Sequence, residues 1–511
     1  MSAVYYSTTP PPPAPKPSPD ASSRAGKTRQ AARKALLVRS AAALAGIVVS
    51  ALIVTAAVQP QSALSPQGAI TLVVFVLAVW LWVFTSIDDT YVALGAATVL
   101  VLTGTMDTSA LFSTLGEETI WLLLAAFVIA AAVSASGLAN RGATFIITGA
   151  STPRQLVHLV TLALVVTTFA VPSTSGRAAL ALPVFLALRQ VLTDHPPLVK
   201  TLAILFPSVI LLSAVGSFLG AGAHLITSQI LETATGSGFD FATWLLYGLP
   251  LALVASHICA EIVLRLFTRP EDRKISLSVS AQDLERHSDT PVTGPLTVAE
   301  SRAALLLGAV IVLWCTEPLH GLDPALVALI GALVAASPSY GSVKLASALK
   351  SVPWSLLLFM AATLALGNAL ISTGAADWLA GGALTPIQAL GAAAAPLFVV
   401  AVVLISTLAH LVIQSRSARS AVLIPIVIAL SPAVGVNPIA AAFASTAAAG
   451  FCHTLTSSAK PVAMFAAVDG IDTYTPRDLL RLSAFLAPVN VVLVLGFSFT
   501  LWPLMGLPVL D

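Results

Sequence analysis

Long apolar segments alternate with short polar connections along most of this chain. A helix needs about 20 residues to cross the hydrocarbon core of a membrane, and stretches close to that length recur throughout the sequence. The pattern predicts about eleven membrane-spanning helices, at residues 41–59, 68–87, 91–105, 119–137, 200–220, 243–268, 303–316, 322–338, 354–373, 436–456 and 479–505. We therefore expect an all-α polytopic membrane protein.

Two further apolar segments do not fit a simple crossing. Residues 155–192 and 387–431 each consist of two apolar arms, about 15 residues long, on either side of a hydroxyl-rich turn. Arms of this length fall short of a full span. We interpret both segments as re-entrant hairpins whose tips lie near the middle of the membrane.

The two hairpin turns share a sequence pattern. Residues 173–184 read STSGRAALALPV and residues 415–426 read SRSARSAVLIPI. The alignment pairs five positions: Ser173 with Ser415, Ser175 with Ser417, Arg177 with Arg419, Ala179 with Ala421 and Pro183 with Pro425. Polar backbone and fixed cations at membrane depth cost free energy, and they usually mark a transport path.

The longest hydrophilic insert, residues 269–301, divides the chain into two similar halves. The first half opens with LWVFTSIDDTYVALGAATVLVLTG from Leu81, and the second with LWCTEPLHGLDPALVALIGALVAA from Leu313. This similarity indicates an internal repeat. Each unit has an odd number of crossings, so the second unit, 302–511, would enter the membrane inverted relative to the first, 68–268. Inverted repeats place a binding site where the two units meet.

Each hairpin is followed by a span that contains glycines or hydroxyl groups at mid-length. The first such run is SAVGSFLGAGAHLITS, from Ser213, and the second is HTLTSSAKP, from His453. Both indicate unwound helices, whose exposed peptide groups and half-helix ends hold ions: amino termini favour anions and carbonyl ends favour cations. Two tips and two broken helices would enclose one polar site.

Composition and charge support this topology. Apolar residues make up 57% of the 511 residues and charged residues only 9%, which excludes a soluble globular protein. Residues 1–40 are Pro-rich and basic, and predict a disordered cytoplasmic tail before a first membrane helix and loop at 41–67. The positive-inside rule makes the 269–301 linker cytoplasmic as well, and leaves the carboxyl terminus external in a plasma (inner) membrane. The three scattered cysteines indicate neither a disulfide nor a zinc site.

From about Leu81 to the carboxyl terminus, the sequence resembles the divalent anion:sodium symporters of the ion transporter superfamily. Members are similar in having a Ser-Asn-Thr turn at each hairpin tip and a Thr-Pro-Pro turn in each broken helix. Here the tips align as Ser173–Ser175 and Ser415–Ser417, and the later turns as Gly220–Ala223 and Ser457–Lys460. The resemblance implies a carboxylate or sulfate held between the tips, sodium beside each tip, a homodimer and an elevator-like movement. No other cofactor is implied.

The candidate site combines the tips with the later turns. The expected substrate-binding residues are Ser173, Thr174, Ser175, Arg177, Ser415, Arg416, Ser417, Arg419, Ser458 and Lys460. The expected sodium-binding residues are Ser173, Thr174, Ser175, Gly220 and Gly222. Both family asparagines are absent. At the second tip Arg416 takes that place, where a guanidinium would repel sodium, could replace it, and offers paired donors to a carboxylate or sulfate.

Structural interpretations compete with these roles. Arg177 and Arg419 could instead pin their hairpins to neighbouring carbonyls, and Lys460 could form a salt bridge or snorkel. His224, His410 and His453 could relay protons, although a lone histidine in a bundle is more often a hydrogen-bonded core residue. Glu261 and Arg265 are expected to form an i,i+4 pair near the cytoplasmic face.

The sequence thus predicts a secondary active transporter, a symporter of small divalent anions of the dicarboxylate or sulfate type that is cation-coupled. The alternative within transport is a sodium-independent anion exchanger or a proton-coupled carrier of another oxyanion. A membrane-embedded enzyme is the alternative of another class, but the sequence contains no HExxH motif and no paired carboxylates within spans, and it has no P-loop to drive an ATP-dependent pump.

Overall fold

The computed structural model describes residues 46–48, 50–55, 64–286, 293–379, 381, 391–468 and 471–510. Helices account for nearly all of the regular structure in these ranges. The exception is one short antiparallel ribbon of β1 (Ala467–Val468) and β2 (Ile471–Asp472). The all-α prediction is confirmed. The basic tail at 1–40 and most of the first expected span lie outside the described residues.

Nine helical segments in the described ranges are long and apolar enough to cross a membrane. They are built around α2 (Pro66–Phe84), α5 (Glu118–Ser136), α7 (Pro153–Ala170), α9 (Pro196–Leu212), α11 (Phe241–Phe267), α13 (Val298–Cys315), α17 (Trp354–Ser372), α19 (Ala394–Leu408) and α23 (Pro476–Gly496). Three other expected spans form shorter apolar helices: α3 (Asp89–Leu102), α15 (Pro324–Ala335) and α21 (Pro438–Ala448). Two of the nine, α7 and the segment around α19, are first arms of the expected hairpins, so these arms are longer than the roughly 15 residues expected and are long enough to cross. The expected total of about eleven crossings stays a prediction.

Short helical elements connect or extend these helices. They are α4 (Thr108–Ser113), η1 (Thr114–Gly116), α6 (Leu138–Ile147), α12 (Ala281–Glu285), α14 (Glu317–His320), α16 (Leu345–Ser351), η4 (Gly391–Ala393), η6 (Pro432–Val434), η8 (Phe497–Leu501) and α24 (Trp502–Leu504). Helix α6 is tied to the linker by Arg141, which donates to Glu300 at 3.2 Å and also to the carbonyl of Gly294.

Both predicted hairpin tips are turns that lead directly into a helix. In the first, α7 ends at Ala170 and α8 (Thr174–Val191) begins four residues later. In the second, α19 and η5 (Ala409–Leu411) precede α20 (Arg416–Leu430). The tip serines cap the new helices, since Ser173 Oγ accepts from Gly176 N at 3.3 Å and Ser415 Oγ from Ala418 N at 3.2 Å. The capping hydroxyls therefore explain why both helices start at the repeated motif.

Both predicted broken helices are interrupted where the sequence indicates. Helix α9 gives way to η2 (Ser213–Gly216) and η3 (Phe218–Gly220) before α10 (Gly222–Thr235). Helix α21 is followed by a loop and η7 (Thr456–Ser458) before α22 (Lys460–Ala466). The residues that precede the two new helices, Ala221 and Ala459, have the same extended conformation, with φ and ψ of −158° and 147° against −157° and 144°. The alignment of Gly220–Ala223 with Ser457–Lys460 is therefore one residue out of register, since it pairs Ala221 with Ser458 and not with Ala459.

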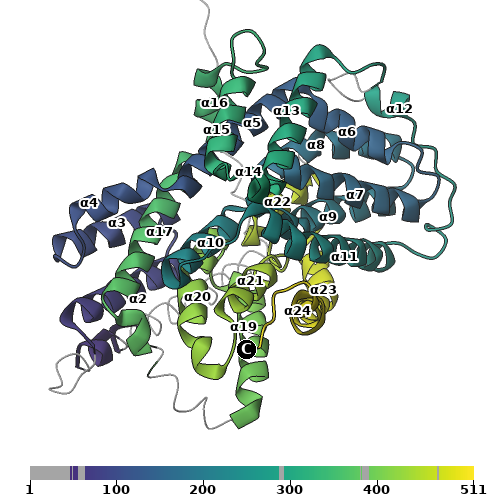
Figure 1. The fold of residues 1–511 in the computed structure, drawn as a ribbon. Helices are drawn as coiled ribbons and strands as arrows, with labels where there is room; N and C mark the ends of the chain where they lie inside the picture. The colour runs from purple at the N-terminus through teal and green to yellow at the C-terminus, as the bar shows by residue number, and fades with distance from the viewer. Residues whose placement is uncertain are drawn as a thin grey trace, which may run out of the picture.

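Helices from the two halves pack reciprocally (Figure 1). Helix α5 of the first half packs along α15 of the second, and α17 of the second packs along α3 of the first. Around the tips, α10 packs on α20 and α22 packs on α8. Each broken helix therefore meets the hairpin helix of the other half. The repeat units proposed from the sequence stay a prediction.

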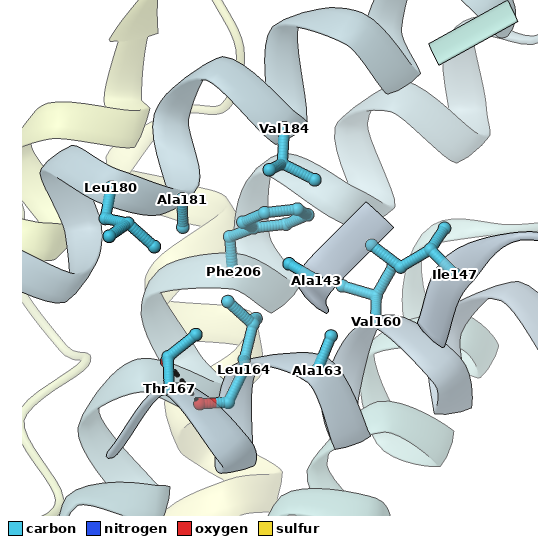
Figure 2. A pocket seen from close by; sticks show the side chains of 10 residues that line it. All are labelled: Ala143, Ile147, Val160, Ala163, Leu164, Thr167, Leu180, Ala181, Val184 and Phe206. Atoms are coloured by element: carbon cyan, nitrogen blue, oxygen red, sulfur yellow. Dashed lines mark hydrogen bonds between the residues drawn. The ribbon is translucent and has the colours of Figure 1, made fainter. Parts of the chain in front are cut away.

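The interior of the first hairpin is apolar and closely packed. Figure 2 shows side chains of α6, α7, α8 and α9 around a cavity of only about 10 Å³. Thr167 is the one polar side chain among those that line it, and its hydroxyl donates to the carbonyl of Leu164 at 2.7 Å. The space between the arms is roughly that of a single water molecule and is unsuited to an anion. The polar chemistry lies at the tip.

Candidate functional site

Arg177, four residues after the first tip serine, is fully buried and bonded to the protein. Its Nε donates to Thr167 Oγ1 at 3.1 Å, and Nη1 donates to the carbonyl of Ile210 at 2.9 Å. Its Nη2 donates to the carbonyl of Leu164 at 2.6 Å and to Ser213 Oγ at 2.7 Å. These bonds hold the tip of the hairpin against the broken end of α9. This arrangement favours the pinning interpretation of Arg177 over contact with substrate.

Arg419 occupies the matching place in the second hairpin but has fewer partners. Its Nη1 donates to the carbonyls of Ala449 at 2.9 Å and Phe451 at 3.5 Å, directly after the end of α21. Its Nε and Nη2 are buried and have no hydrogen-bond partner among the described residues. Arg419 therefore pins its hairpin and still has donors for a further acceptor.

Arg416 lies where the two halves meet. Its Nη2 is 3.3 Å from Nε2 of His224, on α10. A β-carbon built on Gly450, in the second broken helix, would come within 3.1 Å of Nη2. The Nε and Nη1 atoms of Arg416 are buried and have no partner in the described part of the chain. Unpaired buried donors are costly, which makes this guanidinium a place for an external acceptor.

His224 holds Arg416 from the first broken helix. Its Nδ1 lies 3.0 Å from the carbonyl of Ser217, so the proton sits on Nδ1 and the lone pair of Nε2 faces the guanidinium. The imidazole is fully buried and stacks on Trp244, with centroids 4.8 Å apart. A neutral imidazole thus orients one end of Arg416 and leaves the other nitrogens free.

The three arginines form one positively charged region. Arg416 lies close enough to Arg177 and to Arg419 for each pair to repel electrostatically. Among the described residues, none of the three forms a salt bridge. The carboxyl group of Asp89, on α3, lies beside the tip residue Ser415. Uncompensated positive charge in such a position favours an anion.

The tip hydroxyls differ in how they are used. Those of Ser173 and Ser415 accept the capping bonds, and Ser458 Oγ accepts from Leu455 N at 3.0 Å. The hydroxyls of Thr174, Ser175 and Ser417 form no hydrogen bond within the described ranges, which leaves them free for a ligand. Ser417 Oγ lies 3.4 Å from the β-carbon position of Gly222, so the second tip touches the start of α10. Lys460, at the start of α22, is exposed.

The residues fit sodium at the first tip and not at the second. Thr174 and Ser175 offer free hydroxyl oxygens there, and Thr168 Oγ1, which faces Gly220, is buried and unpaired. Hard oxygen ligands of this kind suit an alkali cation. At the second tip the aligned position is Arg416, and a fixed guanidinium repels a metal cation. The expected role of Gly222 in sodium binding stays a prediction, since its nearest polar neighbour is Ser417.

The three histidines are buried and hydrogen-bonded. His410 lies 2.7 Å from the carbonyl of Thr407 and 2.8 Å from Thr454 Oγ1. His453 lies 3.3 Å from the carbonyl of Ser208. These contacts agree with the structural interpretation of the histidines. The sequence pattern does not predict that His224 and Gly450 lie beside Arg416. A glycine directly before the second unwound segment is the only local signal of that approach.

Comparisons with known proteins agree with this architecture. Residues 39–507 match the family model described as the sodium:sulfate symporter transmembrane region. The chain is 25% identical to the sodium-dependent dicarboxylate transporter SdcS of Staphylococcus saprophyticus over 85% of this chain and 88% of that protein. It is 26% identical to the chloroplastic dicarboxylate transporter 1 of Spinacia oleracea, over 87% and 79%. A membrane protein of Cupriavidus necator is 24% identical over 75% and 74%.

Solved structures show the same fold. The YdaH transporter of Alcanivorax borkumensis matches with a TM-score of 0.51 and 14% identity, over 88% of this chain and all of that one. MtrF of Neisseria gonorrhoeae matches with a TM-score of 0.54 and 12% identity, over 87% and 96%. A family match across most of the chain confirms a multi-pass membrane transporter of small anions and not a membrane-embedded enzyme. The chain belongs to the sodium:sulfate symporter family, the divalent anion:sodium symporters.

Proposed function

We propose that this transporter carries small divalent anions of the dicarboxylate or sulfate type across the plasma membrane. The observation that carries the proposal is the set of unpaired guanidinium nitrogens of Arg416 and Arg419, in a region without salt bridges. A carboxylate or sulfate presents several oxygens to such donors, and charge-assisted bonds of this kind are the stronger ones. SdcS and the spinach protein, both named as dicarboxylate transporters, support the same class of substrate.

The substrate would lie between the two tips and the two broken helices. Thr174, Arg416, Gly222 and Lys460 each begin a helix, and helix amino termini favour anions. The helices that begin at Thr174, Arg416 and Gly222 are connected through the hydrogen bonds of Arg177 and the contact of Arg416 with His224. Lys460 would contribute from the edge of the site through charge alone.

For coupling, we propose a single sodium at the first tip, with Arg416 in the role of a permanent cation at the second. The sodium ion would neutralise part of the charge of a bound divalent anion, and Arg416 and Arg419 would neutralise the rest. Exchange without sodium is the second candidate. The specific feature in its favour is Arg416, because a fixed cation that never leaves the protein needs no ion gradient.

Movement and assembly complete the proposal. The hairpins and broken helices, α7–α10 and α19–α22, would move as one unit against the helices that pack reciprocally, α3, α5, α15 and α17. This would carry the site across the membrane in an elevator-like step within a homodimer. The amino terminus would be cytoplasmic and the carboxyl terminus external.

Uptake by proteoliposomes tests the proposal. Purified protein should accumulate labelled succinate or sulfate when external sodium exceeds internal sodium, and not when choline replaces sodium. Uptake that persists in choline and requires internal unlabelled anion would replace symport by exchange. No uptake of either anion under both conditions, with protein that unfolds cooperatively, would overturn the assignment of substrate class.

A further inference from the structure

A second cluster of polar side chains lies far from the tips, between α7 and α11. His158 Nε2 is 2.9 Å from Glu261 Oε1, and its Nδ1 is 2.8 Å from Nδ1 of His257. Arg154 Nε donates to Glu261 Oε1 at 2.5 Å, and Arg265 Nη2 lies 3.2 Å from Oε2. The expected pair of Glu261 and Arg265 is therefore present, but it is one part of a five-residue cluster.

This cluster lines a cleft of about 420 Å³ together with Ile258 and Ile262. The guanidinium side chains are 67% exposed at Arg154 and 68% exposed at Arg265. Each uses only one nitrogen on Glu261, so the remaining N–H groups have no partner among the described residues. Two arginines share a single carboxylate here, so the cleft is net positive even with both imidazoles neutral.

Below the cluster, the same two helices expose apolar side chains. On α7, Arg154, His158, Leu162 and Val166 follow each other at four-residue intervals, with Leu162 39% and Val166 48% exposed. On α11, Val254 is exposed one turn before His257. The groove therefore has a cationic end and an apolar continuation, which points toward the middle of α7.

The geometry points to a binding site for the phosphate headgroup of an anionic phospholipid in the groove between α7 and α11. Phosphate oxygens would accept from the free N–H groups of Arg154 and Arg265, which match phosphate geometry. The acyl chains would lie along Leu162, Val166 and Val254. Basic pockets between membrane helices at one face of the bilayer have the chemistry to hold such headgroups.

The groove lies far from the first hairpin tip, at the other end of α7. Arg154 is at the opposite end of α7 from the tip, about 25 Å away along the helix. A headgroup bridging Arg154 and Arg265 would clamp the base of the first hairpin to α11. The lipid would thus stabilise the hairpin without entering the transport site.

Thermal unfolding of the detergent-solubilised protein tests this inference. Phosphatidylglycerol should raise the unfolding temperature, because a ligand that binds only the folded state stabilises it, and phosphatidylcholine at equal concentration should not. The variant R154Q/R265Q should lose most of that shift. The control R269Q/K274Q, which removes two exposed cations just beyond α11, should keep it.

Three results would overturn the inference. They are an equal shift in R154Q/R265Q, an equal shift with phosphatidylcholine, and an equal shift with sodium phosphate alone, which would indicate a soluble anion. Hydrogen exchange of the parent protein answers the same question should the double variant fail to fold. Phosphatidylglycerol should slow exchange around residues 151–158 and 257–268, and an unchanged pattern there would contradict the proposal.

Discussion

The two hairpin tips start from the same sequence pattern and end with different chemistry. At the first tip, the nearest cation, Arg177, donates to two hydroxyls and two carbonyls of its own half. At the second, Arg416 and Arg419 keep four buried nitrogens without a partner in the described residues. The cation of the first tip is therefore hydrogen-bonded within the protein, whereas the cations of the second tip still have nitrogens available to an external acceptor.

This difference indicates that the two tips are suited to different ions. The first tip suits a metal cation, because its arginine is hydrogen-bonded to the protein and its hydroxyl groups are free. The second tip suits an anion, because it has free guanidinium nitrogens. An arginine four residues past the tip serine is common to both. Each of these arginines also contacts the carbonyl end of the half-helix before the break, α9 or α21. The contact of this arginine with a half-helix is therefore a shared feature of the fold. The tips differ in the unpaired nitrogens of Arg416 and Arg419, which in the proposed function are the donors to the anion.

The largest effect should come from removing the bonded arginine. Arg177→Ala would leave Ser213, Thr167 and two carbonyls without their donor, and each buried group left unsatisfied costs about 1–3 kcal/mol. We expect the free energy of unfolding to fall by at least about 3 kcal/mol. Denaturant titration in detergent micelles measures it.

The matched variant for that measurement is Arg416→Ala. It removes a single 3.3 Å contact and a repulsive charge, so its unfolding free energy should change by less than about 1 kcal/mol. Equal losses of stability in the two variants would show that the tips are used alike, and the comparison would fail.

The next effect concerns sodium. Ser175→Ala removes a free hydroxyl at the first tip, and a ligand of this strength is worth about 1 kcal/mol, so half-maximal activation of uptake should need about fivefold more sodium. Ser417→Ala, the equivalent change at the second tip, should leave sodium activation unchanged. If Ser417→Ala shifts the sodium dependence more than Ser175→Ala does, the sodium ion binds at the second tip and the proposal is contradicted.

The smallest effect should come from Gly450→Ala. Its new methyl group would press on Arg416 Nη2 and on the carbonyl of Ala447, and the guanidinium would shift by a few tenths of an ångström. We expect KM for the anion to rise by about threefold, a loss near 0.7 kcal/mol in binding. Stability should fall as well, because the main-chain carbonyl of Ala447 must shift. Gly308→Ala on α13, where a β-carbon meets nothing within 4 Å, is the control and should behave like the parent.

Much of this architecture was predictable from the sequence. Serine, glycine and proline within apolar segments mark the tips and the unwound helices, because those residues cap helices or cannot continue them. The partners of Arg177 were not predictable, since they include main-chain carbonyls, and every residue has one. The contact of Arg416 with His224 spans 192 positions and depends on how α10 packs against α20. The apolar pattern does not predict helix α6 because, at 10 residues, this helix is too short for a membrane span.

Direct binding of the anion to variants of Arg416 tests the central claim most directly. Arg416→Gln keeps a polar side chain and removes the charge, and a charge-assisted bond is worth about 1.5–3 kcal/mol. The dissociation constant for succinate or sulfate, measured by isothermal titration calorimetry, should therefore rise by about 10- to 100-fold. Arg481→Gln, which removes a cation that lies 5.9 Å from the ring of Phe267, should bind like the parent. An unchanged dissociation constant in folded Arg416→Gln would contradict the account.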